Sequence, residues 1–327
     1  MKVLFLIQGE QVAASRYRVL QFIPYLNAEG IETEVSAYPG TPPELVRFLS
    51  GLPRYDCLFL QRKRFSGPLL ALVRRRARKI VFDFDDSIMY RNSKAGSPHS
   101  KTRMKRFADM VKASDFIIAG NRFLMEQTRT FTDRVTVIPT AIDADRYIPK
   151  DYARKKERVT IGWIGDHGSI HYMEKMKPLF EELGKRHPEA ELSIVCDVFI
   201  DCDSIPVIKK IWSQQTEIAD LQDMDIGLMP LVNDLWSEGK CGLKILQYFG
   251  VAVPAVCTPV GVNKDVVADG ISGFYARSPE EWLEKLSALI TNPSLRKEMG
   301  LKGRQTVLED YTVQACAPKL VKILKTV

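Results

Sequence analysis

Two lysines that flank a cysteine and a glycine form the part of the sequence best suited to chemistry. The run EGKCGLK places Lys240 and Lys244 on either side of Gly242, where an apolar periodic pattern predicts a helix over 242–250. The first backbone N–H groups of a helix have no intrahelical acceptor, and the helix dipole favours negative charge there. Two ammonium groups beside such a helix start predict a site for a phosphorylated ligand. The alternative is that Gly242 only begins the helix and both lysines are solvated.

The residues around these lysines give the run a family resemblance. It opens Gly-Lys-Cys-x-x-Lys, continues Leu-Gln-Tyr-x-x-x-x-x-Pro, and is followed by a Thr-Pro-Val-Gly turn at 258–261. This pattern resembles the donor-site signature of the family-4 glycosyltransferases. The better-known form of the signature has two glutamates separated by seven residues. Here the second glutamate position falls on Gln247, and the first falls on Gly239, one place after Glu238.

The resemblance implies a retaining GT-B glycosyltransferase whose nucleotide-diphosphate sugar is a substrate, with no cofactor. Charge on the departing diphosphate is then stabilised by cationic side chains and a helix start, without a metal. The predicted catalytic residues are Lys240, Lys244 and Glu238. The predicted donor-binding residues are Gly165, Asp166, His167, Gly168, Ser169, Cys241, Gly242, Leu243 and Gln247.

A glycine-rich run supplies the first five of these donor-binding residues. In GWIGDHGSIHYM the glycines are spaced G-x-x-G-x-x-G between a predicted strand and a predicted helix, and the run resembles the glycine-rich donor loop of the same family. The turn after the first strand of the chain, near Gly9, lacks the GxGxxG that a nicotinamide dinucleotide would require. The sequence therefore disfavours a dehydrogenase.

An acidic cluster follows a predicted strand in VFDFDDSI. Asp83 and Asp85 alternate along the strand as in the metal-binding DxD motif of GT-A glycosyltransferases. A second complete alternation of strands and helices argues against GT-A, so we expect no metal site. Asp85 and Asp86 are expected to bind acceptor hydroxyls or to orient Arg16 and Arg18, and capping of the next segment is the alternative. The predicted acceptor or cleft residues are Ser15, Arg16, Arg18, Asp85 and Asp86.

Strands and helices alternate twice along the chain, with helices predicted, among others, over 15–29, 101–113 and 170–186. The 327 residues exceed the size of one ordinary core. We therefore predict an α/β fold with two Rossmann-like doubly wound domains facing a cleft, the GT-B architecture. The predicted boundaries are 1–145 for an N-terminal acceptor domain, 146–157 for a linker, 158–311 for a donor-binding domain, and 312–327 for a helix that packs back onto the first domain.

Positive charge is concentrated in the first half of the chain. Residues 1–150 carry 25 Lys and Arg against 15 Asp and Glu, whereas residues 151–327 carry 22 against 25. The clusters at 62–64, 74–79 and 101–106 suit an anionic membrane surface or a polyanionic acceptor, and a solvated basic face is the alternative. No nucleic-acid-binding pattern accompanies the charge, so we expect no nucleic-acid partner.

The expected location is cytoplasmic, with peripheral contact to the inner face of the membrane. We find no apolar run long enough to span a bilayer and no signal peptide, and the six scattered cysteines are expected to be reduced. The expected reaction is transfer of a sugar from a nucleotide donor to a glycan or lipid-linked acceptor. A nucleotide-sugar-binding pseudoenzyme and a nucleotide-sugar epimerase are the alternatives on the same fold.

Overall fold

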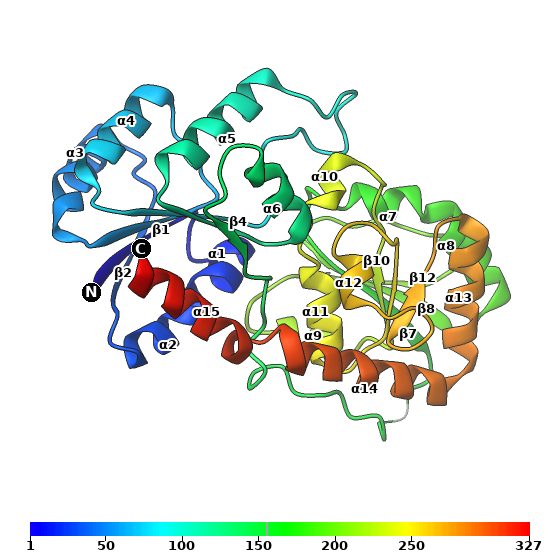
Figure 1. Cartoon of the computed structure of the whole chain (residues 1–327). Helices are drawn as coiled ribbons and strands as arrows, with labels where there is room; N and C mark the ends of the chain where they lie inside the picture. The colour runs from blue at the N-terminus through cyan, green and yellow to red at the C-terminus, as the bar shows by residue number, and fades with distance from the viewer. Residues whose placement is uncertain (155) are drawn as a thin grey trace. The chain divides into compact units, whose positions relative to one another are not determined.

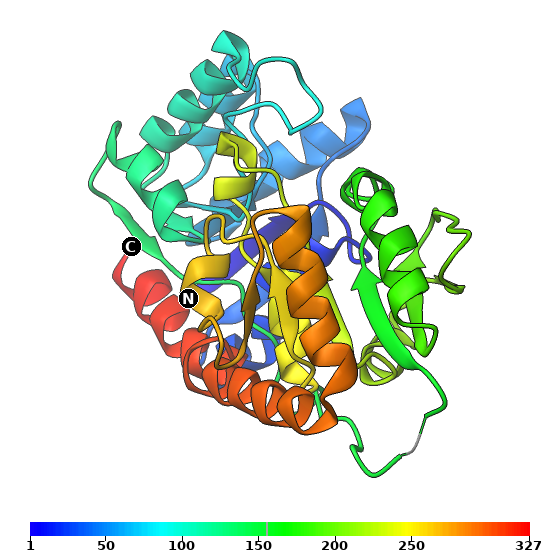
Figure 2. The same cartoon turned by 90° about the vertical axis from the view of Figure 1, so that its right-hand side faces the viewer.

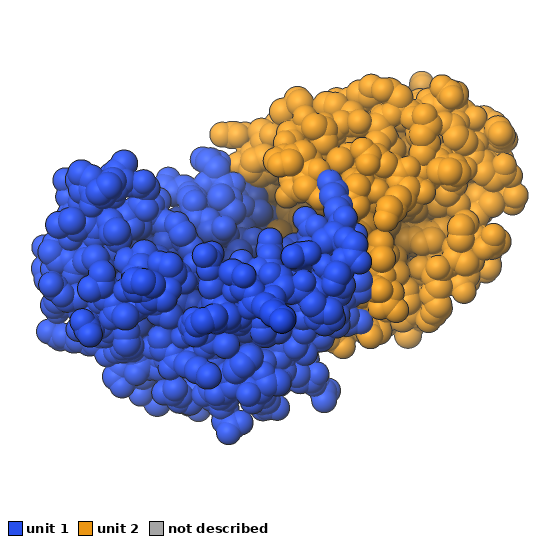
Figure 3. Space-filling model, turned by 90° about the horizontal axis from the view of Figure 1, so that it is seen from above, with its two compact units in different colours: residues 1–141, 234–241, 313–327 blue, residues 142–233, 242–312 orange. Residues whose placement is uncertain are grey.

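The computed structural model describes residues 1–154 and 156–327, which form two compact units (Figure 1). Figure 3 colours the two units separately. Each unit contains one six-stranded sheet in which all pairings are parallel. The predicted α/β class with two doubly wound units is therefore confirmed. Unit 1 comprises Met1–Ala141, Asp234–Cys241 and Val313–Val327, and unit 2 comprises Ile142–Asn233 and Gly242–Thr312.

The sheet of unit 1 has the strand order β2-β1-β3-β4-β5-β6. The chain runs outward from β1 to β2, then returns to the other side of β1 to form β3. In open parallel sheets of this kind, ligands bind beyond the carboxyl ends of the strands where the order reverses, which here is between β1 and β3. The strands are β1 Lys2–Ile7, β2 Glu32–Ala37, β3 Cys57–Gln61, β4 Ile80–Phe84, β5 Phe116–Ala119 and β6 Val135–Val137.

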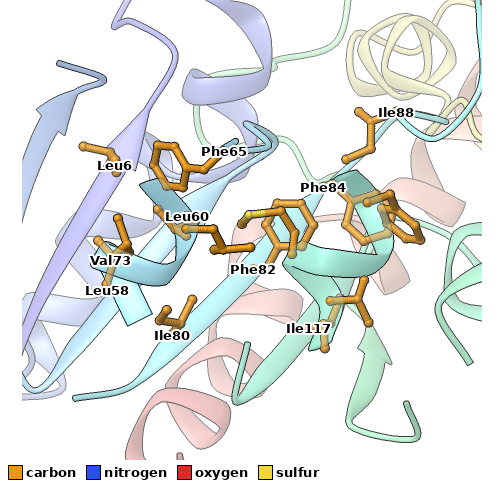
Figure 4. Close-up of a cluster of buried hydrophobic side chains, with 14 of the residues drawn as sticks. Leu6, Leu58, Leu60, Phe65, Val73, Ile80, Phe82, Phe84, Ile88 and Ile117 are labelled. Carbon is orange, nitrogen blue, oxygen red and sulfur yellow. The ribbon is translucent and has the colours of Figure 1, made fainter. Parts of the chain in front are cut away.

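Alternating side chains of this sheet supply two hydrophobic layers. Leu58, Leu60 and Phe82 point to the face covered by α4 and α5, as Figure 4 shows. Phe5 and Phe59 point to the opposite face, which is covered by α1, α2 and α15. Two faces of buried side chains explain why these strands are apolar at nearly every position. The helices of unit 1 are α1 Ala13–Arg18, η1 Leu20–Phe22, α2 Ile23–Ala28, α3 Pro42–Gly51, η2 Leu52–Arg54, α4 Gly67–Arg76, α5 Lys101–Ala113, α6 Arg122–Arg129, α10 Leu235–Glu238 and α15 Val313–Thr326.

Two predicted helices are interrupted in the structure. The predicted helix over 15–29 is divided into α1, η1 and α2, and Pro24 lies in the first turn of α2. The predicted helix over 170–186 is divided at Met176, and Pro178 lies in the first turn of its second part. Proline lacks a backbone N–H and is tolerated at a helix start but not in a helix interior. Each proline therefore begins a new helix.

The sheet of unit 2 has the strand order β12-β11-β10-β7-β8-β9. Counted from β7, this is the order of a dinucleotide-binding Rossmann sheet, and it reverses between β7 and β10. A ligand of unit 2 is therefore expected beyond the carboxyl ends of β7 and β10. The strands are β7 Val159–Ile164, β8 Ala190–Cys196, β9 Val207–Ile211, β10 Ile226–Met229, β11 Ala255–Cys257 and β12 Gly273–Tyr275.

Helices cover both faces of the second sheet. Leu179 and Phe180 of α8 and Leu286 of α13 pack with sheet residues in one buried cluster, whereas α11 packs against α14. Figures 1 and 2 show α13 beside the sheet and α14 running across below α13. The helices of unit 2 are α7 His171–Lys175, α8 Lys177–Arg186, α9 Glu217–Gln222, α11 Leu243–Gly250, α12 Asn263–Val266, α13 Pro279–Thr291 and α14 Pro293–Asp310.

Contacts divide the chain differently from the predicted boundaries at two places. The segment 146–157 was predicted as a linker, but Lys150 is buried in unit 2 with its ammonium 2.6 Å from a carboxylate oxygen of Asp225. Lys155 of that segment lies outside the described residues. The segment 234–241 was predicted to belong to the second domain, but it packs in unit 1 through Ser87 and Asn121. Both differences arise from side-chain pairs that are distant in sequence.

Candidate functional site

The start of α11 forms the centre of the candidate site in unit 2. Gly242 precedes the helix with φ 69° and ψ 14°, a left-handed conformation that favours glycine. A Cβ atom on Gly242 would also lie 3.0 Å from Cγ1 of Val262, just after the predicted Thr-Pro-Val-Gly turn. Gly242 thus permits both the backbone turn and close packing. The helix that follows presents its first N–H groups at Leu243 and beyond, as the sequence predicts.

Lys244 lies in the first turn of α11 and is half-buried. Its ammonium is 5.5 Å from the centroid of the Trp163 indole, within the range of a cation–π interaction. Trp163 belongs to β7, the strand beside the reversal of the sheet order. Unit 2 therefore holds a cation and a helix start where the strand order predicts a ligand.

The glycine-rich loop 165–169 follows β7 directly and is held in place from two sides. A Cβ atom on Gly165 would lie 2.3 Å from the Trp163 ring, so this close approach requires glycine. Nδ1 of His167 lies 2.6 Å from Oδ2 of Asp197, and the His167 backbone N–H donates to Oδ1 of the same carboxylate at 2.8 Å. The hydrogen bond from His167 lowers the pKa of Asp197 below its ordinary value.

Asp166 and Ser169 form hydrogen bonds with each other within the same loop. The Ser169 hydroxyl donates to the Asp166 carboxylate at 3.1 Å, and the Ser169 backbone N–H donates to the Asp166 carbonyl at 2.9 Å. All five residues of the predicted donor loop are thereby brought to the strand end at which Lys244 contacts Trp163. Asp197 was not predicted; it directly follows the buried apolar strand β8, and that position was a usable signal.

Gln247 lies in a buried polar network of unit 2. Its Nε2 donates to the Tyr147 hydroxyl at 3.2 Å, which in turn donates to Glu217 at 3.2 Å. The other oxygen of Glu217 accepts from the Trp212 indole N–H at 2.9 Å. The network holds the Gln247 amide inside the unit, at 4% exposure, so contact with a ribose stays a prediction. Sequence reasoning missed this network because its members come from separate elements.

The segment 234–241 carries the remaining predicted catalytic residues and lies in unit 1. The ammonium of Lys240 is 2.8 Å from Oδ1 of Asp86 and 4.7 Å from the centroid of the Trp236 ring. Asn121 Nδ2 donates to the carbonyl oxygens of Glu238 and Lys240 at 3.0 and 3.1 Å. These bonds fix the backbone of the segment on unit 1. The chain passes into unit 2 after Cys241, so convergence of Lys240 and Lys244 on one anion stays a prediction.

Close packing anchors the same segment. A Cβ atom on Gly239 would lie 2.0 Å from Oγ of Ser87, and one on Gly120 would lie 2.5 Å from the sulfur of Cys241. Cys241 was predicted to bind the donor, but its side chain lies in a buried hydrophobic cluster of unit 1. Burial raises the pKa of this thiol well above its ordinary value. A donor can therefore contact Cys241 only through the backbone of this residue.

The acidic cluster pairs with different cations from those expected. Arg62 donates from Nε to Asp85 at 2.9 Å and from Nη2 to Asp86 at 2.8 Å. The prediction that Asp85 and Asp86 orient Arg16 and Arg18 is wrong for Arg18, which makes its hydrogen-bonded ion pair with Asp83 instead. The sequence placed Arg62 in the basic cluster 62–64 but did not predict its pairing with these carboxylates, because Arg62 reaches them through the pairing of β3 with β4.

The predicted acceptor residues of α1 lie inside unit 1. Arg18 makes two contacts with the Asp83 carboxylate and donates to the Ile138 carbonyl at 2.7 Å. The Ser15 hydroxyl donates to Oε1 of Gln61 at 3.1 Å. Arg16 is 8% exposed, with its guanidinium 5.0 Å from the centroid of the Tyr17 ring. Burial of Ser15 and Arg18 gives both side chains a role in holding α1 on the sheet.

Three general expectations can be compared with the described residues. Within 1–154 and 156–327, no cluster of three or more His, Cys, Asp or Glu side chains is arranged to hold a metal ion. In the same part of the chain, no helix combines the length and apolar character needed to cross a membrane. All six cysteines are free thiols.

Comparison with known proteins identifies a family segment within the chain. Residues 202–292 match the family model described as Glycosyl transferases group 1. Trehalose synthase of Pyrococcus horikoshii is 28% identical over 85 residues, which cover 26% of this chain and 20% of that protein. The chain therefore matches only about a fifth of the length of this curated relative.

Solved structures resemble the whole chain. Sucrose-phosphate synthase from Thermosynechococcus elongatus superposes with a TM-score of 0.77 at 11% identity, over 99% of this chain and 98% of that one. Anabaena HepE in complex with UDP and glucose gives a TM-score of 0.72 at 12% identity, over 100% of both chains. These likenesses confirm the predicted GT-B fold.

The whole chain therefore has the GT-B fold, and one segment of it matches the group 1 glycosyltransferase model. The group 1 segment itself is confined to residues 202–292, which include the start of α11 and Lys244.

Proposed function

We propose that the protein transfers a sugar from a uridine-diphosphate donor to a glycan or lipid-linked acceptor. The observation that carries the proposal is the placement of Lys244, the start of α11 and the loop 165–169 around Trp163, where the Rossmann-type order of unit 2 reverses. The choice of uridine is supported by the complexes of HepE with UDP and with UDP-glucose.

The proposed chemistry depends on positive charge at the departing diphosphate. When the bond between sugar and diphosphate breaks, negative charge grows on the phosphate oxygens. The ammonium of Lys244 and the N–H groups at Gly242 and Leu243 stabilise that charge, and the loop 165–169 packs against the sugar or phosphate. In this proposal transfer proceeds without a metal and with retention at the anomeric carbon, as the family-4 resemblance implies.

Unit 1 supplies the acceptor side in the same proposal. Glu238, Asp85 and Asp86 are carboxylates suited to bind sugar hydroxyls. Lys240 assists the leaving phosphate only if it exchanges its contact with Asp86 for a phosphate oxygen. The basic surface of unit 1 provides peripheral contact with an anionic membrane when the acceptor is lipid-linked.

Calorimetric titration of the full chain with UDP tests the donor site. Lys244→Ala is expected to weaken UDP binding by about tenfold or more, because a hydrogen bond to a charged group is lost. The matched control is Lys185→Ala, which removes an exposed lysine at the end of α8 in the same unit. Equal UDP affinities of the Lys244→Ala variant and the parent protein would remove the proposed phosphate site.

Turnover with UDP-glucose and a mixture of saccharide acceptors then separates the three functions on this fold. Formation of a glycosylated acceptor together with UDP supports transfer, and addition of EDTA tests the metal-independent mechanism. A changed sugar that stays attached to UDP would identify an epimerase. Binding of UDP-glucose without transfer or hydrolysis would identify a pseudoenzyme.

A further inference from the structure

A cavity of about 510 Å³ opens at the carboxyl edge of the first sheet. Its wall contains Gln8 directly after β1, Tyr38 directly after β2, the segment 62–64 directly after β3, and Ile88 beyond β4. The sheet order reverses between β1 and β3, so the cavity lies where open parallel sheets bind their ligands. None of the residues predicted to bind the acceptor lines this cavity.

The wall of the cavity is strongly basic. Within the part of the chain that the structure describes, four cations and no carboxylate line it; the cations are Arg62, Lys63, Arg64 and Arg106. Arg62 is neutralised from outside the cavity by Asp85 and Asp86. No ion pair of the other three with a carboxylate is found among the described residues. Like charges in a partly desolvated space repel one another unless an anion lies between them.

Arg64 shows this repulsion most clearly. Burial, followed by the positive charges of Arg103 and Arg106, lowers the pKa of Arg64 to about 10. The guanidinium is nevertheless held in place, because Nη1 donates to the carbonyl oxygen of Ile88. An anion bound beside Arg64 would reverse the unfavourable interaction.

The backbone and Tyr38 also position these cations. Arg62 has φ 62°, a left-handed conformation that is uncommon for a residue other than glycine and that concentrates at ligand sites. The Lys63 ammonium lies 4.4 Å from the centroid of the Tyr38 ring, and the Tyr38 hydroxyl donates to the Gln61 carbonyl at 2.7 Å. The turn after β3 is therefore shaped to present consecutive cations at one strand end.

We propose that this cavity binds a phosphate group carried by the acceptor, so that the acceptor is a phosphorylated saccharide. The proposal rests on the function proposed above and names its substrate class. Arginine binds phosphate through paired N–H groups and lysine binds it as a point charge, which fits the mixed cations of the wall. A volume of about 510 Å³ suits a small molecule such as a sugar phosphate.

The experiment titrates the full chain with glucose 6-phosphate, inorganic phosphate and glucose, each in the presence of saturating UDP to occupy the donor site. Glucose 6-phosphate is expected to bind at least about tenfold more tightly than glucose, with an affinity that falls as salt rises. Arg106→Gln is expected to weaken that binding about tenfold. The control is Lys105→Gln, an exposed neighbour on α5 that pairs with Asp109 and does not line the cavity.

Flotation with vesicles of phosphatidylcholine, with and without phosphatidylglycerol, distinguishes a cavity from a basic face that binds membranes. Binding of glucose 6-phosphate that Arg106→Gln weakens and Lys105→Gln preserves supports the proposal. Equal binding of glucose and glucose 6-phosphate, an unaffected Arg106→Gln variant, or binding to anionic vesicles alone would overturn it. UDP affinity, measured separately, reports on the proposed glycosyltransferase function, so failure of the two proposals can be told apart.

Discussion

The ammonium of Lys240 lies 2.8 Å from Oδ1 of Asp86, a residue 154 positions earlier in the chain. Asp86 also accepts from Arg62 at 2.8 Å, so one carboxylate, 11% exposed, joins two cations of unit 1. This arrangement attaches the segment 234–241 to the strand end of β4. Lys240, a predicted catalytic residue, therefore forms an ion pair with a carboxylate of its own unit.

Asp86→Asn is expected to lower the free energy of unfolding by about 2 kcal/mol, because the partly buried Lys240 loses its carboxylate partner and Arg62 keeps only Asp85. Urea denaturation of the variant and the parent protein measures the change. Asp109→Asn, which removes an exposed helix pair with Lys105, is the control and should cost less than about 0.5 kcal/mol. Equal losses in the two variants would show that the Asp86 contacts contribute no more than a surface pair.

Asp83→Asn is expected to lower the free energy of unfolding by about 3 kcal/mol. Asp83 and Arg18 are both almost fully buried, and removal of the carboxylate charge leaves the guanidinium uncompensated. Arg18→Lys keeps the charge but loses the forked geometry, so it should give a smaller loss. Urea denaturation measures both variants, and UDP affinity should stay near that of the parent protein. A loss below about 1 kcal/mol for Asp83→Asn would contradict a buried ion pair.

Acid is expected to destabilise unit 2 through Asp225. Burial would raise the pKa of Asp225, but Lys150, the Thr160 backbone N–H and Lys156 together lower it below its ordinary value. A depressed pKa in the folded state adds stability that is present above the unfolded pKa, near 4, and is lost as pH falls through the folded pKa. Denaturation midpoints between pH 6 and about pH 2 should therefore fall more for the parent protein than for Asp225→Asn. Parallel pH profiles of the two proteins would exclude this contribution.

Gly242→Ala is expected to cost about 2 kcal/mol of stability and to weaken UDP binding. The left-handed backbone alone costs an alanine about 1 kcal/mol, and the Cβ atom 3.0 Å from Val262 adds crowding. Gly270→Ala provides a matched control, because Gly270 has φ 76° with no atom within 4 Å of the added Cβ. Thermal melting and UDP titration measure both variants. Similar effects of the two substitutions would show that Val262 does not restrict this position.

Local periodicity allowed much of the fold to be predicted. The helix expected over 101–113 is α5 at the same residues. The glycine-rich run was expected after a strand, and Gly165–Ser169 directly follow β7. A strand of period two and a helix of period 3.6 are encoded within a few neighbouring residues, so such features can be read without a tertiary structure. Helix α6 was missed, and two long helices were not divided at their prolines.

The amino-acid sequence by itself therefore determined the two α/β units, the helix start at Gly242 and the position of Lys244 beside it. Only the tertiary structure decided that Asp83 pairs with Arg18, that Asp86 pairs with Lys240, and that 234–241 packs in unit 1. It also decided that the cations at 62–64 and Arg106 share one cavity. The physical reason is that these contacts join residues far apart in the chain. Their partners are chosen by strand order and helix packing, which no local pattern of residues specifies.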